Sequence, residues 1–139
     1  MNYDNENRGK IQYRNRKRQI IDFSGLRYGN ITPTDIDGYL EYHDKAMIFI
    51  ELKHNDAQVP YRQRLALERS VDNNAAAGKK SVLFVCHHYV DDPDQDIIAA
   101  NAIVKEVYYK GKYIYPIKEF TLKQLLDYFI EMVDSELFF

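Results

Sequence analysis

The stretch of residues 31–54 constrains the fold more than any other part of this sequence. It contains the apolar run Met47-Ile48-Phe49-Ile50, whose β-branched and aromatic residues predict a buried strand rather than a helix. The run continues directly into Glu51-Leu52-Lys53. Because successive side chains of a strand point to opposite faces, the glutamate and the lysine are expected side by side on one face.

A second strand is predicted just upstream, at residues 37–42, where polar or small residues alternate with apolar ones. Residues 43–45 form a short polar turn that would join the two strands in a hairpin. That hairpin would bring Asp37 to the level of Glu51, and Asp35 would share the face of Asp37 if the strand begins that early. At least two carboxylates and one ammonium group are therefore expected to converge at a strand end.

Such a group of side chains suits metal-assisted hydrolysis of a phosphodiester bond. Mg²⁺ usually takes one or two protein carboxylates together with waters and phosphate oxygens. A neighbouring ammonium group can orient the attacking water and offset charge in the transition state. The structural alternative is an exposed Glu–Lys pair, which contributes under about 1 kcal/mol to stability. An isolated E-x-K pattern fits that alternative more often, so the surrounding residues decide between the two.

The surrounding residues resemble those of the PD-(D/E)XK nuclease superfamily, which includes restriction endonucleases, RecB-type nuclease domains and archaeal Holliday-junction resolvases. The resemblance covers about the central half of the chain, from Pro33-Thr34-Asp35-Ile36-Asp37-Gly38 through a polar turn to Glu51-Leu52-Lys53. It implies that the last tripeptide fills the E-x-K positions. The aspartate of the motif is either Asp37, which directly precedes the strand, or Asp35, which follows Pro33 with one residue inserted.

The resemblance implies a nuclease that depends on Mg²⁺ or Mn²⁺ and hydrolyses DNA, as in the processing of phage or mobile-element DNA. Asp37 and Glu51 would hold the metal ion with Asp35 adjacent, and Lys53 would position and activate the water. The alternative from another class is a non-catalytic domain of the same fold that binds nucleic acid or protein, such as a phage inhibitor of host defence.

A helix is predicted at residues 61–77, because Pro60 suits the first helical position and Gly78 the end of a helix. Apolar residues recur every four positions along it, and Gln63 begins the same stripe. In the superfamily, a similarly placed glutamine on the helix after the lysine supports the active site or contacts the nucleic acid. Gln63 is therefore a further candidate site residue, with a surface glutamine as the structural alternative.

The remaining pattern predicts a mixed sheet. Residues 81–86 are apolar nearly throughout, which is typical of a central strand covered on both faces. Residues 107–115 predict a hairpin, and residues 121–124 have the capping-box spacing that begins a final helix. His87 lies just after the central strand and is expected at the edge of the cleft. We therefore expect an α/β domain whose mixed central sheet is flanked by helices, resembling the restriction-endonuclease core.

Length and charge limit the organisation and the partners. With 139 residues, 45% of them hydrophobic, the chain suits one core, so we expect a single domain at residues 11–139 after a flexible tail at residues 1–10. A net charge of −2 argues against a general polyanion binder, but the N-terminal cations cluster without intervening acids. Contacts with the phosphate backbone of DNA are predicted for Arg14, Arg16, Lys17, Arg18 and Arg62.

Compartment and assembly are also predicted from the sequence. No apolar run is long enough to span a membrane, and the first residues lack the hydrophobic segment of a signal peptide, so we expect a cytoplasmic protein without a membrane partner. A homodimer is expected, because one active site cuts one strand and closed two-fold dimers are the commonest oligomers. The aromatic hairpin at residues 108–115, or apolar Phe138 and Phe139, would supply the interface.

Overall fold

The computed structural model of the chain describes residues 9–10 and 22–136. The DNA contacts predicted for Arg14, Arg16, Lys17 and Arg18 lie outside the described residues, as does the interface predicted for Phe138 and Phe139. The chain divides into two compact units, residues 1–33 and residues 34–139. In the first unit, Tyr28 and Ile31 form an isolated antiparallel bridge, with N–H···O distances of 2.8 and 3.0 Å.

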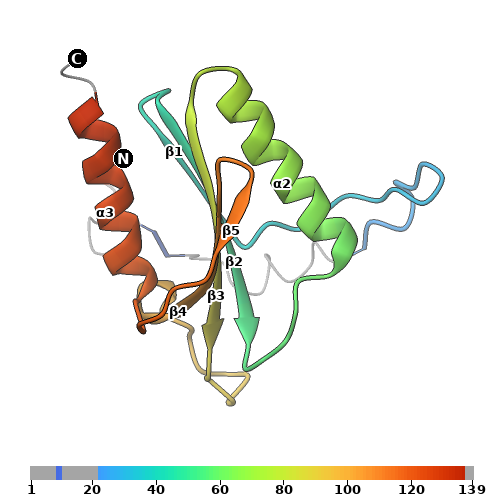
Figure 1. The fold of residues 1–139 in the computed structure, drawn as a ribbon. Coiled ribbons are helices and arrows are strands. Elements are labelled where there is room, and N and C mark those ends of the chain that lie inside the picture. Colours follow the sequence, from blue (N-terminus) through green and yellow to red (C-terminus); the bar gives the residue numbers. More distant parts are fainter. Residues whose placement is uncertain (1–8, 11–21, 137–139) are drawn as a thin grey trace, which may run out of the picture. The chain divides into compact units, whose positions relative to one another are not determined.

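The second unit is an α/β domain built on a five-stranded mixed sheet (Figure 1). Its strands lie in the sheet in the order in which they occur in the chain: β1 (Gly38–Tyr42), β2 (Ala46–His54), β3 (Lys80–His88), β4 (Ile103–Tyr109) and β5 (Lys112–Ile114). β2 and β3 are parallel, and the other neighbouring pairs are antiparallel. The predicted fold class, a mixed sheet flanked by helices, is confirmed.

One helix covers each face of the sheet (Figure 1). α2 (Tyr61–Ala76) connects β2 to β3, and α3 (Leu122–Ser135) follows β5; a 3₁₀ turn, η2 (Ala99–Asn101), precedes β4. The helix predicted at residues 61–77 is thus confirmed to within one residue. Pro60 is the N-cap rather than the first helical residue, and Gly78 follows the helix with a φ of +88°, which glycine adopts without strain.

Both predicted hairpins are present, and each turns through residues with positive φ. His43 and Asp44 have φ values of 52° and 58° in the β1–β2 turn. Lys110 and Gly111 have φ values of 50° and 77° in the β4–β5 turn, and Lys112 already belongs to β5. Positive φ at both central residues gives a turn the twist that antiparallel strands need. These turns fix the register of both hairpins.

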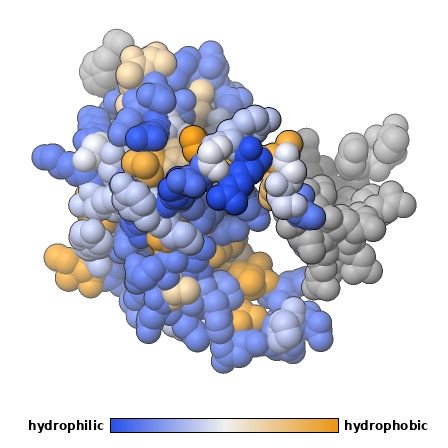
Figure 2. Space-filling model, turned by 90° about the vertical axis from the view of Figure 1, so that its right-hand side faces the viewer, coloured by the Kyte–Doolittle hydropathy of each residue, from blue (hydrophilic) through white to orange (hydrophobic). Residues whose placement is uncertain are grey.

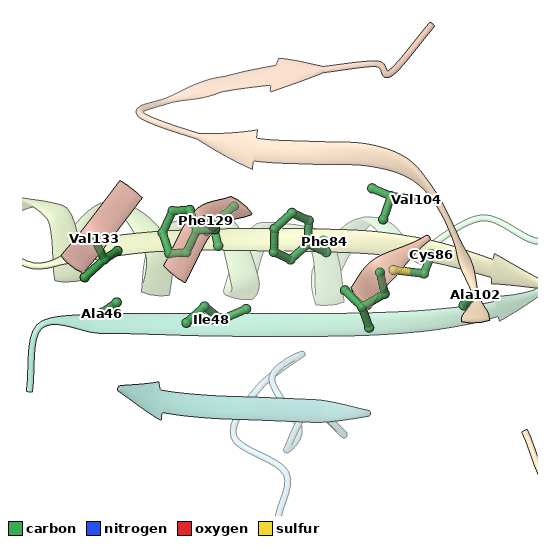
Figure 3. Close-up of a cluster of buried hydrophobic side chains, with 10 residues drawn as sticks. Ala46, Ile48, Phe84, Cys86, Ala102, Val104, Phe129 and Val133 are labelled. Carbon is green, nitrogen blue, oxygen red and sulfur yellow. The ribbon is translucent and has the colours of Figure 1, made fainter. Parts of the chain in front are cut away.

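The larger core lies between the sheet and α3. Alternate residues of the central strands, among them Ile48 of β2 and Phe84 of β3, point toward Phe129 and Val133 of α3 (Figure 3). The rings of Phe84 and Phe129 meet edge to face, with centroids 6.4 Å apart. The buried thiol of Cys86 belongs to the same cluster, and burial raises its pKa to about 12.

A second core lies between the opposite face of the sheet and α2. Phe49 of β2 and Leu83 of β3 pack there against Leu67 and Val71, which form the buried stripe of α2. Because side chains alternate along a strand, odd-numbered residues of β2 and β3 face α2 and even-numbered residues face α3. This alternation decides which helix each polar side chain of β2 faces.

None of the helices in residues 22–136 is long and apolar enough to cross a membrane.

The N-terminus of α3 carries the capping box that the sequence predicts. The hydroxyl of Thr121 accepts a hydrogen bond from the N–H of Gln124 at 3.2 Å, and the N–H of Thr121 donates to the Gln124 side chain at 2.9 Å. We expect Thr121→Ala to lower the free energy of unfolding by about 1 kcal/mol. Thr121→Ser keeps the hydroxyl and should stay close to the wild type in urea unfolding. An alanine variant as stable as the wild type would contradict this role of the cap.

Candidate active site

The candidate site is centred on Glu51, a carboxyl group buried inside the sheet. Glu51 lies in β2 on the face that α2 covers, and its side chain is 0% exposed. Its neighbour across the parallel β2–β3 pair is the apolar Val85. A charge buried beside apolar neighbours is unfavourable unless other groups compensate it. The partners of this carboxyl group therefore determine what the site can do.

Asp37 reaches Glu51 from the residue that precedes β1. The β1–β2 register pairs Gly38 with Ile50, which places Asp37 at the level of Glu51. The N–H of Asp37 donates to Glu51 Oε1 at 3.4 Å, and Asp37 Oδ2 accepts a hydrogen bond from the N–H of Leu52 at 2.7 Å. The two carboxyl groups are thus held side by side by the ends of the hairpin strands.

Gln63 reaches the same carboxyl group from the first turn of α2. Its Nε2 donates to Glu51 Oε2 at 3.1 Å and to the main-chain carbonyl of Asp35 at 2.7 Å. The amide group therefore ties three segments together, namely α2, β2 and the chain entering β1. This placement goes beyond a solvated surface glutamine, because Gln63 contacts the buried acid directly.

Burial raises the pKa of Glu51 to about 7, from an ordinary value of 4.5, and the negative charge of Asp37 adds to this effect. The N–H of Asp37 and the positive charge of Lys53 act in the opposite direction and offset only part of it. Near neutral pH, Glu51 therefore lies close to the midpoint between its protonated and ionised forms. A cation beside the two acids would favour the ionised form.

Lys53 lies two residues beyond Glu51 on the same face of β2, as the alternation of the strand predicts. It is half-buried, and its register partner in β3 is His87, which is buried at 7% exposure. The Nδ1 atom of His87 contacts the main-chain carbonyl of Asn55. Because a carbonyl oxygen only accepts, Nδ1 must carry the proton in this contact. His87 thus lies beside Lys53, and it is the penultimate residue of β3 rather than a residue that follows the strand.

The carboxylates of Asp37 and Glu51 fit a hard divalent cation that keeps most of its coordinated waters. Among the described residues, no group of three or more His, Cys, Asp or Glu side chains is arranged to hold a metal ion. Asp37 and Glu51 supply two carboxylates, which is the number that Mg²⁺ usually takes from a protein. Asp35 joins the group through its main-chain carbonyl, so the contacts bring the carboxylate of Asp37, and not that of Asp35, next to Glu51.

The structure also shows neighbouring contacts that the sequence does not reveal. Arg64, one residue after Gln63, forms an ion pair with Glu106 of β4 at 2.7 Å, and both side chains are largely buried. Arg64 also lies over the ring of Tyr113, 5.1 Å from its centroid. Arg62, predicted to contact DNA, lies exposed in the same first turn of α2. Seen from the α2 side, the described residues present mostly hydrophilic side chains (Figure 2).

Comparison of the chain with protein families, with curated proteins and with solved structures finds no match.

The raised pKa of Glu51 predicts how stability depends on pH. Between about pH 4.5 and 7 the folded protein holds a proton on Glu51 that the unfolded chain has released, so stability falls as the pH rises through this interval. Glu51→Gln stays neutral at every pH. We expect it to exceed the wild type by about 2–3 kcal/mol at pH 8 in EDTA, and to match it near pH 4.5.

Urea unfolding at both pH values measures this difference. Glu119→Gln is the matched control, because it makes the same change at an exposed position and should leave the pH dependence as it is in the wild type. A Glu51→Gln variant that is destabilised equally at pH 4.5 and pH 8 would show that burial does not disfavour the ionised form of Glu51.

Proposed function

We propose that this protein is a divalent-metal-dependent nuclease that hydrolyses phosphodiester bonds of DNA, using Mg²⁺ or Mn²⁺. The observation that carries the proposal is the meeting of Asp37, Glu51 and Gln63, with Lys53 on the same face of the same strand. A structural Glu–Lys pair would be exposed at the surface, whereas Glu51 is fully buried. The sequence order of these residues also resembles that of the PD-(D/E)XK superfamily.

The electrostatics of the pair support a cation site. Burial disfavours the ionised form of Glu51, and the negative charge of Asp37 disfavours it further. Lys53 offsets only part of this effect on Glu51. A divalent cation would supply the remaining compensation, and phosphate oxygens and waters would complete its shell. A carboxyl pair of this kind is therefore expected to bind a metal ion more tightly as the pH rises.

Each residue then has a definite task in hydrolysis. Asp37 and Glu51 would hold the ion, and Gln63 would keep Glu51 in place by donating to Oε2. A bound Mg²⁺ would act as a Lewis acid on the phosphate group. Lys53 would position and activate the attacking water and offset negative charge that develops on the phosphate. The site belongs to rigid elements, because its residues come from β2, from α2 and from the start of the β1–β2 hairpin.

DNA is the proposed substrate, with the cytoplasm as the proposed compartment and phage or mobile-element DNA as the proposed context. Arg62 lies in the same helical turn as Gln63 and is exposed, and in this proposal it would contact the phosphate backbone near the scissile bond. The predicted contacts of Arg14, Arg16, Lys17 and Arg18 remain part of this proposal.

The alternative is a domain of the same fold that binds nucleic acid or protein but catalyses no reaction. In a protein that binds no cation there, burying a carboxyl group next to a second one lowers the stability of the fold without compensation. Metal binding and cleavage, measured separately, distinguish the two functions.

Cleavage of labelled DNA with and without Mg²⁺ tests the proposal. Linear, circular and four-way-junction substrates should each be tried with the wild type and with Asp37→Asn, Glu51→Gln and Lys53→Ala. We expect cleavage by the wild type only with the metal, and a loss of at least about 100-fold in each variant. Asp35→Asn should keep most of the activity, because its contact with Gln63 uses the main chain.

Metal binding provides the second measurement. Mg²⁺ should raise the Tm of the wild type, of Lys53→Ala and of the exposed control Lys45→Ala, but not that of Asp37→Asn or Glu51→Gln. Full cleavage by all three site variants would refute the site. DNA binding without cleavage under any divalent metal would instead support the non-catalytic alternative.

A further inference from the structure

An apolar groove lies on the α3 side of the sheet, between α3 and the β4–β5 hairpin. Its volume is about 380 Å³, which is within the range of pockets that bind small molecules or inserted side chains. Phe84 and Phe129 line its buried floor, and Tyr109, Ile114, Tyr128 and Met132 belong to its more accessible walls. All lining residues are apolar or aromatic, and the lining surface is entirely apolar.

The rim of the groove continues as exposed apolar surface. Ile114 of β5 is 52% exposed and Tyr128 of α3 is 68% exposed. Ile117, which follows the lining residue Pro116 in the segment that joins β5 to α3, is also exposed. Exposed apolar side chains gathered around an apolar groove on a small domain usually mark a contact site. On the α2 side, by contrast, the hydrophobic side chains of the described residues form small separate groups (Figure 2).

Charges of opposite sign flank the groove. Lys112 lies two residues before Ile114 and pairs with Tyr109, so its side chain is on the groove face of β5. Glu131 lies three residues after Tyr128 on α3, which places the two on neighbouring parts of the helix surface. Both charged side chains are exposed, and neither takes part in an ion pair within the described part of the chain.

Glu131 differs in this respect from the other acids around α3. Asp127 contacts Lys123 at 2.7 Å, Asp134 accepts hydrogen bonds from the Tyr42 hydroxyl at 2.9 Å, and Glu136 contacts Lys80 at 2.8 Å. Among the acids of α3, Glu131 is thus the one for which no such contact is described. On the opposite rim, Lys112 lies near Lys110, whose Nζ is 5.4 Å from the centroid of the Tyr109 ring.

We propose that this groove is the contact surface of a homodimer, in which a second copy of the chain covers it by two-fold symmetry. In a two-fold contact the same surface is used by both copies, and when the axis runs along the groove, a residue on one rim meets the residue on the other rim of its partner. Lys112 of each copy then faces Glu131 of the other, and the apolar walls meet between these two ion pairs. An apolar centre with a polar rim is the usual anatomy of such interfaces.

Charge complementarity selects the second copy as the occupant. A small apolar ligand would fill the groove but leave both rim charges unused. An unrelated protein would need its own matching pattern, whereas a second copy carries the required pattern on this same surface. The groove lies on the α3 face and Glu51 lies on the α2 face, so this dimer leaves the candidate active site accessible. The proposal therefore does not depend on the proposed nuclease activity.

A charge exchange between the two rims tests the proposal. Light scattering and sedimentation velocity at micromolar concentrations should show a dimer for the wild type. Lys112→Glu and Glu131→Lys each place like charges together at two symmetric positions, so each should raise the dimer Kd by about tenfold or more. The double variant Lys112→Glu/Glu131→Lys restores opposite charges and should recover the dimer. Lys45→Glu makes the same charge change in the β1–β2 turn and should stay dimeric.

Three results would overturn the proposal. The first is a wild type that remains monomeric, and binding of the apolar dye ANS by that monomer would point to a ligand or another protein as the occupant. The second is a dimer that neither single variant weakens. The third is a double variant no better associated than the single ones. Circular dichroism should show a folded protein in every case, since both substituted residues are exposed.

Discussion

The burial of Glu51 is the constraint around which the rest of the domain is arranged. A carboxyl group inside a sheet needs hydrogen-bond donors at short range, and here Gln63 of α2 and the N–H of Asp37 supply them. The hairpin and the helix are therefore tied together through one side chain. The same arrangement leaves the acid close to its ionisation midpoint near neutral pH, which is the basis of the proposal that it binds a cation.

Much of this could be predicted from the sequence, because the deciding patterns are local. Strand alternation placed Glu51 and Lys53 on one face, the polar turn set Asp37 at the level of Glu51, and the four-residue stripe oriented Gln63 toward the sheet. The choice between Asp37 and Asp35 was not predictable. It depends on which residue contributes its carboxylate and which contributes only its main-chain carbonyl. A main-chain contact does not depend on the type of side chain, so the sequence does not predict it.

Features that depend on the register of strands far apart in the sequence could also not be predicted from it. Arg64 meets Glu106 because the β3–β4 register pairs Glu106 with Val85, and no local pattern reveals that register. The apolar groove has the same origin, since it forms only where α3 and the β4–β5 hairpin lie over the same face of the sheet. The two faces thus differ in character. The α2 face carries a buried polar group, and the α3 face carries the larger apolar core.

The most direct test of this account is the titration of Glu51 itself, followed by the carboxyl ¹³C chemical shift in NMR and assigned with the Glu51→Gln variant. Without divalent metal, the account predicts a midpoint near pH 7. Addition of Mg²⁺ should move the midpoint to lower pH, because the cation stabilises the ionised form. A midpoint near the ordinary value of 4.5 that does not respond to Mg²⁺ would contradict the claim that this buried acid is held ready for a metal ion.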